Sequence, residues 1–131
     1  MKAAVGIDTC VVLRLLMGLP EDQAARATRF FSDCMRQGVA LVVDDLVVAE
    51  VYHALLYFYD VPKTQVLATL QAFLATPGVL CRGQAPAVLA ACDGKGAGLI
   101  DRLIRADLLE QTDHLVSFDK DFCRLPGVHA L

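Results

Sequence analysis

Short apolar runs alternate with longer helical patterns along this sequence, and that alternation restricts the fold more than any other feature. Strands are predicted at residues 3–7, 39–43, 79–81, 114–118 and 128–130. Helices are predicted at residues 11–17, 21–37, 46–59, 62–75, 85–92 and 97–110, with a single turn at 121–123. Strands that alternate with helices favour a parallel sheet covered by helices on both faces. We therefore expect the α/β class, as a three-layer α/β/α fold with a central parallel sheet of four to five strands.

The length and composition of the chain predict a single domain over residues 1–131. A chain of 131 residues removes roughly two-thirds of its unfolded surface from water, which is enough for a core. Hydrophobic residues make up 56% of the sequence and charged residues 21%. The formal charge of −3 gives no general attraction to nucleic acid, so binding of a polyanion needs a local basic patch or a metal.

The cysteines and the apolar runs predict a cytoplasmic protein. The five cysteines are odd in number and never form a C-x-x-C pair, which argues against a disulfide framework and against a zinc site. Asp8 and Arg14 interrupt the opening apolar stretch, which argues against a signal peptide. No apolar run reaches the roughly 18 residues of a membrane span, so we expect no membrane contact.

Four acidic residues stand inside or beside stretches that otherwise read as buried core: Asp8, Glu50, Asp101 and Asp119. A buried carboxylate is unfavourable unless a partner compensates its charge. Three of the four have an ordinary alternative explanation. Asp8 and Asp119 follow predicted strands where they can cap the next turn, and Asp101 can pair with Arg105 four residues on.

Glu50 is harder to explain as a surface residue, because its predicted helix is apolar on nearly every side. A cluster of carboxylates without imidazole or thiolate suits Mg²⁺ or Mn²⁺. Two such charges about 4 Å apart repel by roughly 4 kcal/mol at an effective dielectric constant near 20, and a bound cation relieves this repulsion. The same cation can activate water for cleavage of a phosphodiester.

With these residues in order, the whole chain resembles the PIN-domain ribonucleases, especially the VapC-type toxins of bacterial toxin–antitoxin pairs. Gly6-Ile7-Asp8-Thr9 resembles the first motif of that family, and Ala49-Glu50-Val51 matches its second acid. Leu99 to Ala106 matches the third, and Leu115 to Phe122 is very similar to the final Thr/Ser-x-Asp-x-Asp-Phe signature. Cys10 departs from the pattern, since the family usually has Asn there.

The resemblance implies a Mg²⁺- or Mn²⁺-dependent endoribonuclease, the toxin of a toxin–antitoxin pair. It implies that Asp8, Glu50, Asp101 and Asp119 form the catalytic, metal-binding quartet. Thr9, Ser117 and Asp121 would support this quartet. The implied partners are an RNA substrate, a cognate antitoxin and a second copy of the chain in a homodimer, with Tyr52 to Tyr59 carrying either partner contacts or core packing.

The cations closest in sequence to the four acids are Arg14, Lys95, Arg102, Arg105 and Lys120, and they are candidates for contacts to RNA phosphates. Other functions stay open at this point. One is a catalytically silent PIN-like interaction module, and another is a housekeeping PIN nuclease that is not a toxin. An aspartate-nucleophile phosphatase is disfavoured, because that chemistry normally needs a second Asp where Cys10 stands.

Overall fold

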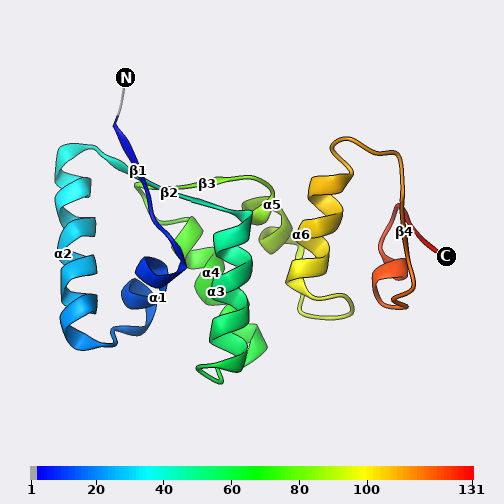
Figure 1. Cartoon of the computed structure of the whole chain (residues 1–131), viewed down its shortest axis with the longest axis horizontal. Helices are drawn as coiled ribbons and strands as arrows, with labels where there is room; N and C mark the ends of the chain where they lie inside the picture. The colour runs from blue at the N-terminus through cyan, green and yellow to red at the C-terminus, as the bar shows by residue number, and fades with distance from the viewer. Residues whose placement is uncertain (1–2) are drawn as a thin grey trace.

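Three strands of the molecule form one parallel sheet, in which β2 lies between β1 and β3. The computed structural model describes residues 3–131, so Met1 and Lys2 of the predicted domain lie outside the described residues. β1 (Ala4–Gly6), β2 (Ala40–Asp44) and β3 (Val79–Arg82) pair with Val5 opposite Leu41 and Val42 opposite Leu80. Figure 1 shows β1 at one edge of this sheet.

The remaining strands form a second, separate sheet. β4 (Leu115–Ser117) and β5 (Val128–Ala130) are parallel, with the turn η1 (Phe122–Arg124) between them. The α/β class with parallel strands is therefore confirmed, but the strands are divided three and two instead of forming one sheet of four to five.

The helices lie where the sequence predicts them, with ends displaced by at most two residues. They are α1 (Thr9–Met17), α2 (Glu21–Gln37), α3 (Asp45–Tyr57), α4 (Lys63–Leu74), α5 (Ala85–Ala91) and α6 (Leu99–Leu108). Gly18 and Gly38 end α1 and α2 with φ values of 71° and 70°, a conformation that glycine adopts without strain. Across residues 3–131, no helix combines the length and the apolar character needed to cross a membrane.

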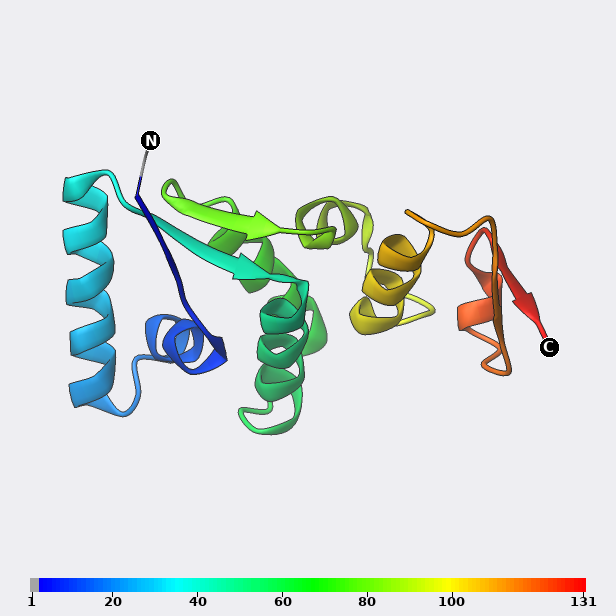
Figure 2. The same cartoon turned by 45° about the horizontal axis from the view of Figure 1, so that its top comes forward.

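The core lies between the three-stranded sheet and the helices on one of its faces. Leu41 and Val43 of β2 are buried against helical residues such as Val12, Val51 and Leu55. Figure 2 shows α1, α3 and α4 beneath the strands. The opposite face is left open: Leu80 of β3 is 56% exposed, whereas its neighbour Val79 is buried. The expected third layer does not cover this face.

The path of α6 explains why the strands divide into two sheets. Leu99 and Leu103 of α6 are buried in the same cluster as Tyr52 and Leu55 of α3. α1 packs on α3 as well, and both views place α3 between α1 and α6 (Figures 1 and 2). Because β4 follows α6 directly, the chain carries β4 to the side of α3 that faces away from β1.

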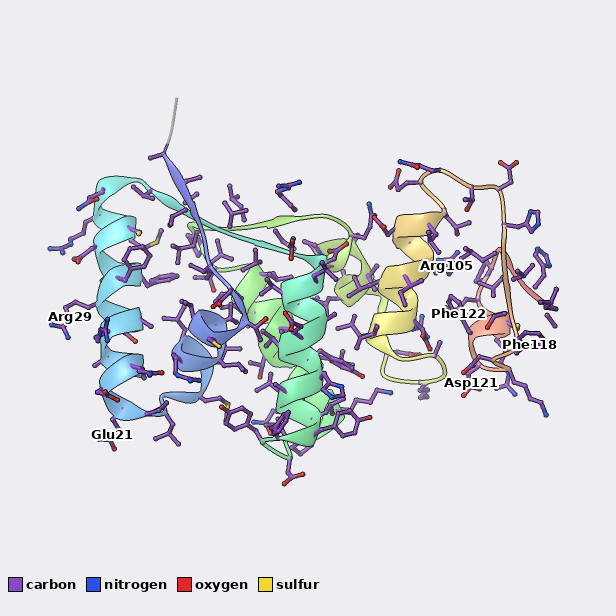
Figure 3. The ribbon with its side chains drawn as sticks, viewed as in Figure 1. Glu21, Arg29, Arg105, Phe118, Asp121 and Phe122 are labelled. Atoms are coloured by element: carbon purple, nitrogen blue, oxygen red, sulfur yellow. The ribbon has the colours of Figure 1, made fainter. Side chains whose placement is uncertain are left out.

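The segment from β4 to β5 is attached to α6, and we call residues 115–131 the terminal unit. Arg105 Nε of α6 donates a hydrogen bond of 2.6 Å to the carbonyl oxygen of Pro126. Leu109 packs beside Gly127, where an added Cβ would lie 3.4 Å from the Leu109 side chain. Figure 3 shows Arg105 between α6 and the terminal unit. α6 and the terminal unit therefore form one connected part of the molecule.

Candidate metal centre

Asp8 stands at the end of β1 and begins α1. The Val11 backbone N–H donates a hydrogen bond of 3.1 Å to Asp8 Oδ1, so Asp8 is the N-cap of the helix. The side chain is exposed. Since the cap uses only Oδ1, Oδ2 remains available to a ligand. The capping role and the metal-binding role predicted from the sequence are therefore compatible.

Glu50 lies beside Asp8 in the fold through its contact with the next residue, Thr9. The Thr9 hydroxyl donates a hydrogen bond of 2.9 Å to Glu50 Oε1 and thereby joins α1 to α3. Glu50 is exposed, so its predicted burial is wrong. The apolar helix α3 buries Val48, Val51, Tyr52 and Leu55 but leaves Leu46 and Tyr57 in solvent. We call Asp8, Thr9 and Glu50 the first half-site.

Asp101 and Asp119 form a second pair on the other side of α3. Partial burial, and then the negative charge of Asp119, raise the pKa of the Asp101 carboxyl above its ordinary value. Asp119 is held at the end of β4 by two hydrogen bonds. Its N–H donates a hydrogen bond of 3.0 Å to Ser117 Oγ, and the Phe122 N–H donates one of 2.9 Å to Asp119 Oδ1. We call Asp101, Ser117 and Asp119 the second half-site.

The two half-sites are not brought together within one chain of this structure. Among residues 3–131, no group of three or more His, Cys, Asp or Glu side chains is placed to hold a metal ion. None of the four acids is buried: Asp101 is half-buried, and the other three are exposed. The donor set still fits a hard cation, because it consists of carboxylate oxygens. Each half-site therefore supplies two of the four expected ligands.

Asp121 lies outside both half-sites as they are built. Its carboxylate is 3.7 Å from Arg124 Nη1, and both side chains are largely exposed. Figure 3 shows Asp121 and Phe122 at the turn that follows β4. Asp121 therefore contributes to the turn, while Thr9 and Ser117 contact the proposed ligands directly.

The cations predicted to bind RNA are mostly engaged within the protein. Arg14 Nε donates a hydrogen bond of 2.6 Å to Gln23 Oε1, and Arg105 Nε donates one to the Pro126 carbonyl oxygen. Arg102 donates from Nε to the Ala97 carbonyl oxygen at 2.8 Å. Lys120 is exposed next to Asp119. These contacts leave Lys95 and Lys120, whose side chains are exposed, as the candidates most available to a phosphate, and Lys120 is the one adjacent to a proposed ligand.

Arg82 is a further residue at the site that the sequence analysis did not single out. It lines a cavity of about 370 Å³ at the carboxyl end of the sheet, together with Gly6, Asp8 and Val42. The sequence signal that could have identified Arg82 is its position directly after the apolar residues 79–81. Ligands of parallel sheets bind at the carboxyl ends of the strands, where a cation can contact them. Arg82 places a positive charge in the cavity that Asp8 borders.

Comparison with known proteins identifies the family of this chain. The family model described as PIN domain matches residues 5–128, a span that contains both half-sites. No curated protein matches the sequence. PIN domains are generally nucleases, which supports a nuclease-type function for this chain. The chain belongs to the PIN domain family.

Proposed function

We propose that this protein is a Mg²⁺- or Mn²⁺-dependent endoribonuclease that hydrolyses RNA phosphodiester bonds. The observation that carries the proposal is the pairing of four carboxylates at two half-sites, in a chain of a family whose members are generally nucleases. Asp8, Glu50, Asp101 and Asp119 would hold the cation. A bound cation supplies charge neutralisation at the phosphate and lowers the pKa of a coordinated water.

The side chains around the carboxylates orient them before any ligand arrives. The Thr9 hydroxyl fixes Glu50 Oε1, and the Val11 N–H fixes Asp8 Oδ1. Ser117 and Phe122 hold the loop that carries Asp119. Such fixed ligands support catalysis because little reorganisation is needed when charge develops. Arg82 and Lys120 are exposed cations beside the acids and would contact RNA phosphates.

We further propose that the protein is the toxin of a VapBC-type pair, on the basis of the sequence motifs described above. An antitoxin would need an apolar docking surface. Tyr57 and Phe58, at the end of α3, are 69% and 79% exposed and offer one. The neighbouring reading frame provides a simple test: a short protein with a DNA-binding amino terminus is expected there, and its absence favours a housekeeping nuclease.

Cleavage of RNA by the purified protein tests the nuclease proposal. Activity is expected with Mg²⁺ or Mn²⁺ and is lost with EDTA. Asp8→Asn and Asp101→Asn are expected to fold and to be inactive. Glu21→Gln is the matched control, because Glu21 is exposed at the start of α2, away from both half-sites (Figure 3), and it should retain full activity. Full activity in both Asn variants would exclude the mechanism.

One observation favours a second candidate, a catalytically silent interaction module. A single chain of this structure does not gather three metal ligands within residues 3–131. Titration with Mn²⁺ separates the candidates: a nuclease is expected to bind the ion, whereas the silent module shows no binding at millimolar concentrations.

A further inference from the structure

β1 and β4 each leave one edge without a partner strand in the part of the chain that the structure describes. On β1, the Ile7 N–H donates to Val42 and the Ala3 carbonyl oxygen accepts from Ala40, so Ala4 and Gly6 direct their backbone groups to the free edge. On β4, Leu115 and Ser117 bond to the β5 side, so Val116 faces outward. Free edges of this kind pair readily with further strands.

Apolar side chains are exposed on the two parts of the molecule that carry these edges. In the terminal unit, Val116, Phe118 and Leu131 are exposed, and Phe118 reaches 81%. Figure 3 shows Phe118 at the outer side of this unit. On the three-stranded sheet, β1 exposes the small residues Ala4 and Gly6, and Leu80 of β3 is exposed two strands away. Pairing the terminal unit with β1 would remove apolar side chains of that unit from water.

The half-sites divide along the same boundary. The first half-site, with Asp8 and Glu50, lies at the end of β1, and the second, with Asp101 and Asp119, lies on α6 and the terminal unit. Pairing β4 beside β1 in parallel would place the ends of both strands, and hence Asp8 and Asp119, at the same edge of one sheet. Each part thus carries two of the four acids and lacks the other two.

We propose that two copies of this chain exchange their terminal units, so that β4 of one copy pairs with β1 of the other. Each active site would then combine Asp8 and Glu50 of one copy with Asp101 and Asp119 of its partner. The exchange is reciprocal, because each copy both gives a terminal unit and receives one, which closes the assembly as a symmetric dimer.

The packing of α6 explains why the partner is a second copy and not the chain's own β1. Leu99 and Leu103 fix α6 on the side of α3 that is opposite to α1, and Arg105 fixes the terminal unit to α6. A return of β4 to its own β1 would separate the terminal unit from α6 and break the Arg105–Pro126 hydrogen bond and the Leu109–Gly127 contact. Exchange with a second copy retains them and covers both free edges.

Mixed dimers test this exchange, which rests on the proposed metal-dependent function. Copies carrying Asp8→Asn and Asp119→Asn, with two different affinity tags, are produced together, and the mixed dimer is purified through both tags. Exchange predicts that one site receives both substitutions and the other receives none. The mixed dimer is therefore expected to show about half the activity of the wild-type dimer, although each homodimer is inactive.

The matched control combines Asp8→Asn with Glu50→Gln, two substitutions on the same half-site. In an exchanged dimer each site then contains one damaged ligand, so no activity returns. Asparagine keeps the capping oxygen that Asp8 and Asp119 provide to Val11 and Phe122, so the Asn variants are expected to fold.

Binding of Mn²⁺, followed by electron paramagnetic resonance, provides a readout that does not depend on RNA cleavage. One Mn²⁺ site per mixed dimer of Asp8→Asn with Asp119→Asn, compared with two per wild-type dimer, supports exchange. This conclusion holds even if the wild type cleaves no RNA, because in that case only the nuclease proposal fails. An active wild type whose mixed dimer neither binds Mn²⁺ nor cleaves RNA overturns the exchange and leaves the nuclease proposal intact. A monomeric wild type, or a wild-type dimer without Mn²⁺ sites, also overturns the exchange.

Discussion

The Thr9 hydroxyl donates a hydrogen bond of 2.9 Å to Glu50 Oε1, and this bond joins the start of α1 to the middle of α3. Neither residue is buried, so packing alone does not fix the Glu50 carboxylate. Loss of a side chain that hydrogen-bonds to a metal ligand typically lowers metal affinity or activity by roughly 10- to 100-fold. The bond therefore gives Thr9 a measurable role at the proposed site.

Replacing Thr9 by Val removes the hydroxyl and keeps the shape of the side chain. Thr9→Val is expected to weaken Mn²⁺ binding and to slow RNA cleavage by about tenfold. Stability should fall by no more than about 1 kcal/mol, because the bond is solvent-accessible. Thr9→Ser is the matched control and should bind and cleave like the wild type. Unchanged Mn²⁺ affinity in Thr9→Val would show that the bond does not position Glu50.

Asp8 is the N-cap of α1 and also a proposed metal ligand, and different substitutions separate these two roles. Asn and Asp are equally good N-caps, whereas Ala at this position costs about 1 kcal/mol. In urea unfolding with EDTA present, Asp8→Ala is expected to lose about 1 kcal/mol of stability, and Asp8→Asn very little. Both variants should be inactive. An Asn variant that is as unstable as the Ala variant would mean that the charge of Asp8, near the positive end of α1, stabilises the helix.

The local structure could be predicted from the sequence because its signals are local. The strand at 128–130 and the helix at 21–37 have the predicted bounds, and α3 begins one residue before its prediction. Asp44, which directly follows the predicted strand 39–43, caps α3 by accepting a hydrogen bond from the Val47 N–H at 3.0 Å. Capping residues, glycines and apolar spacing act within a few residues of each other, so one sequence carries this information.

The partition of the strands depends on contacts between distant parts of the chain, and the sequence did not predict it. Leu99 and Leu103 read equally well as core residues on either side of α3, and the side that they occupy decides where β4 lies. The exposure of Glu50 has a similar origin, since an apolar pattern does not tell which face of a helix is covered. The capping positions of Asp8 and Asp119 were predictable from the sequence, whereas the separation of the four acids into two half-sites was not.

Asp101 gives the metal-free protein a pH-dependent stability. Burial and the charge of Asp119 raise its pKa in the folded state. The folded chain then holds the Asp101 proton more tightly than the unfolded chain, so the contribution to stability is complete below the unfolded pKa and is lost as the pH rises through the folded pKa. Asp101→Asn removes this loss and is expected to be more stable than the wild type at neutral pH.

Urea unfolding in EDTA at several pH values measures this effect. The advantage of Asp101→Asn over the wild type is expected to shrink as the pH falls toward about 4, the ordinary pKa of Asp. Asp33→Asn is the control, because Asp33 forms an ion pair with Arg36 on α2, away from the site. A constant difference between Asp101→Asn and the wild type at all pH values would contradict the titration of Asp101.

Arg102 holds the glycine-rich loop that leads into α6. Its Nε donates to the Ala97 carbonyl oxygen at 2.8 Å, and its Nη2 donates to that of Lys95 at 2.9 Å. Gly94 and Gly96 in this loop have φ values of 81° and 69°. Glycine is conformationally flexible, so the hydrogen bonds from Arg102 are needed to order the backbone of this loop. The structure thus assigns Arg102 a role in the loop, whereas the sequence suggested a role in RNA binding.

Arg102→Ala separates these two roles when it is compared with Lys120→Ala. Loss of two charge-assisted hydrogen bonds is expected to lower the stability by roughly 1–3 kcal/mol and to speed proteolysis between residues 93 and 98. Lys120 is exposed, so Lys120→Ala should keep the stability and weaken RNA cleavage, most strongly at low salt, where a phosphate contact contributes most. Urea unfolding, limited proteolysis and cleavage rates at two salt concentrations measure these outcomes. An Arg102→Ala variant with wild-type stability and a reduced salt dependence of cleavage would instead place Arg102 against the RNA.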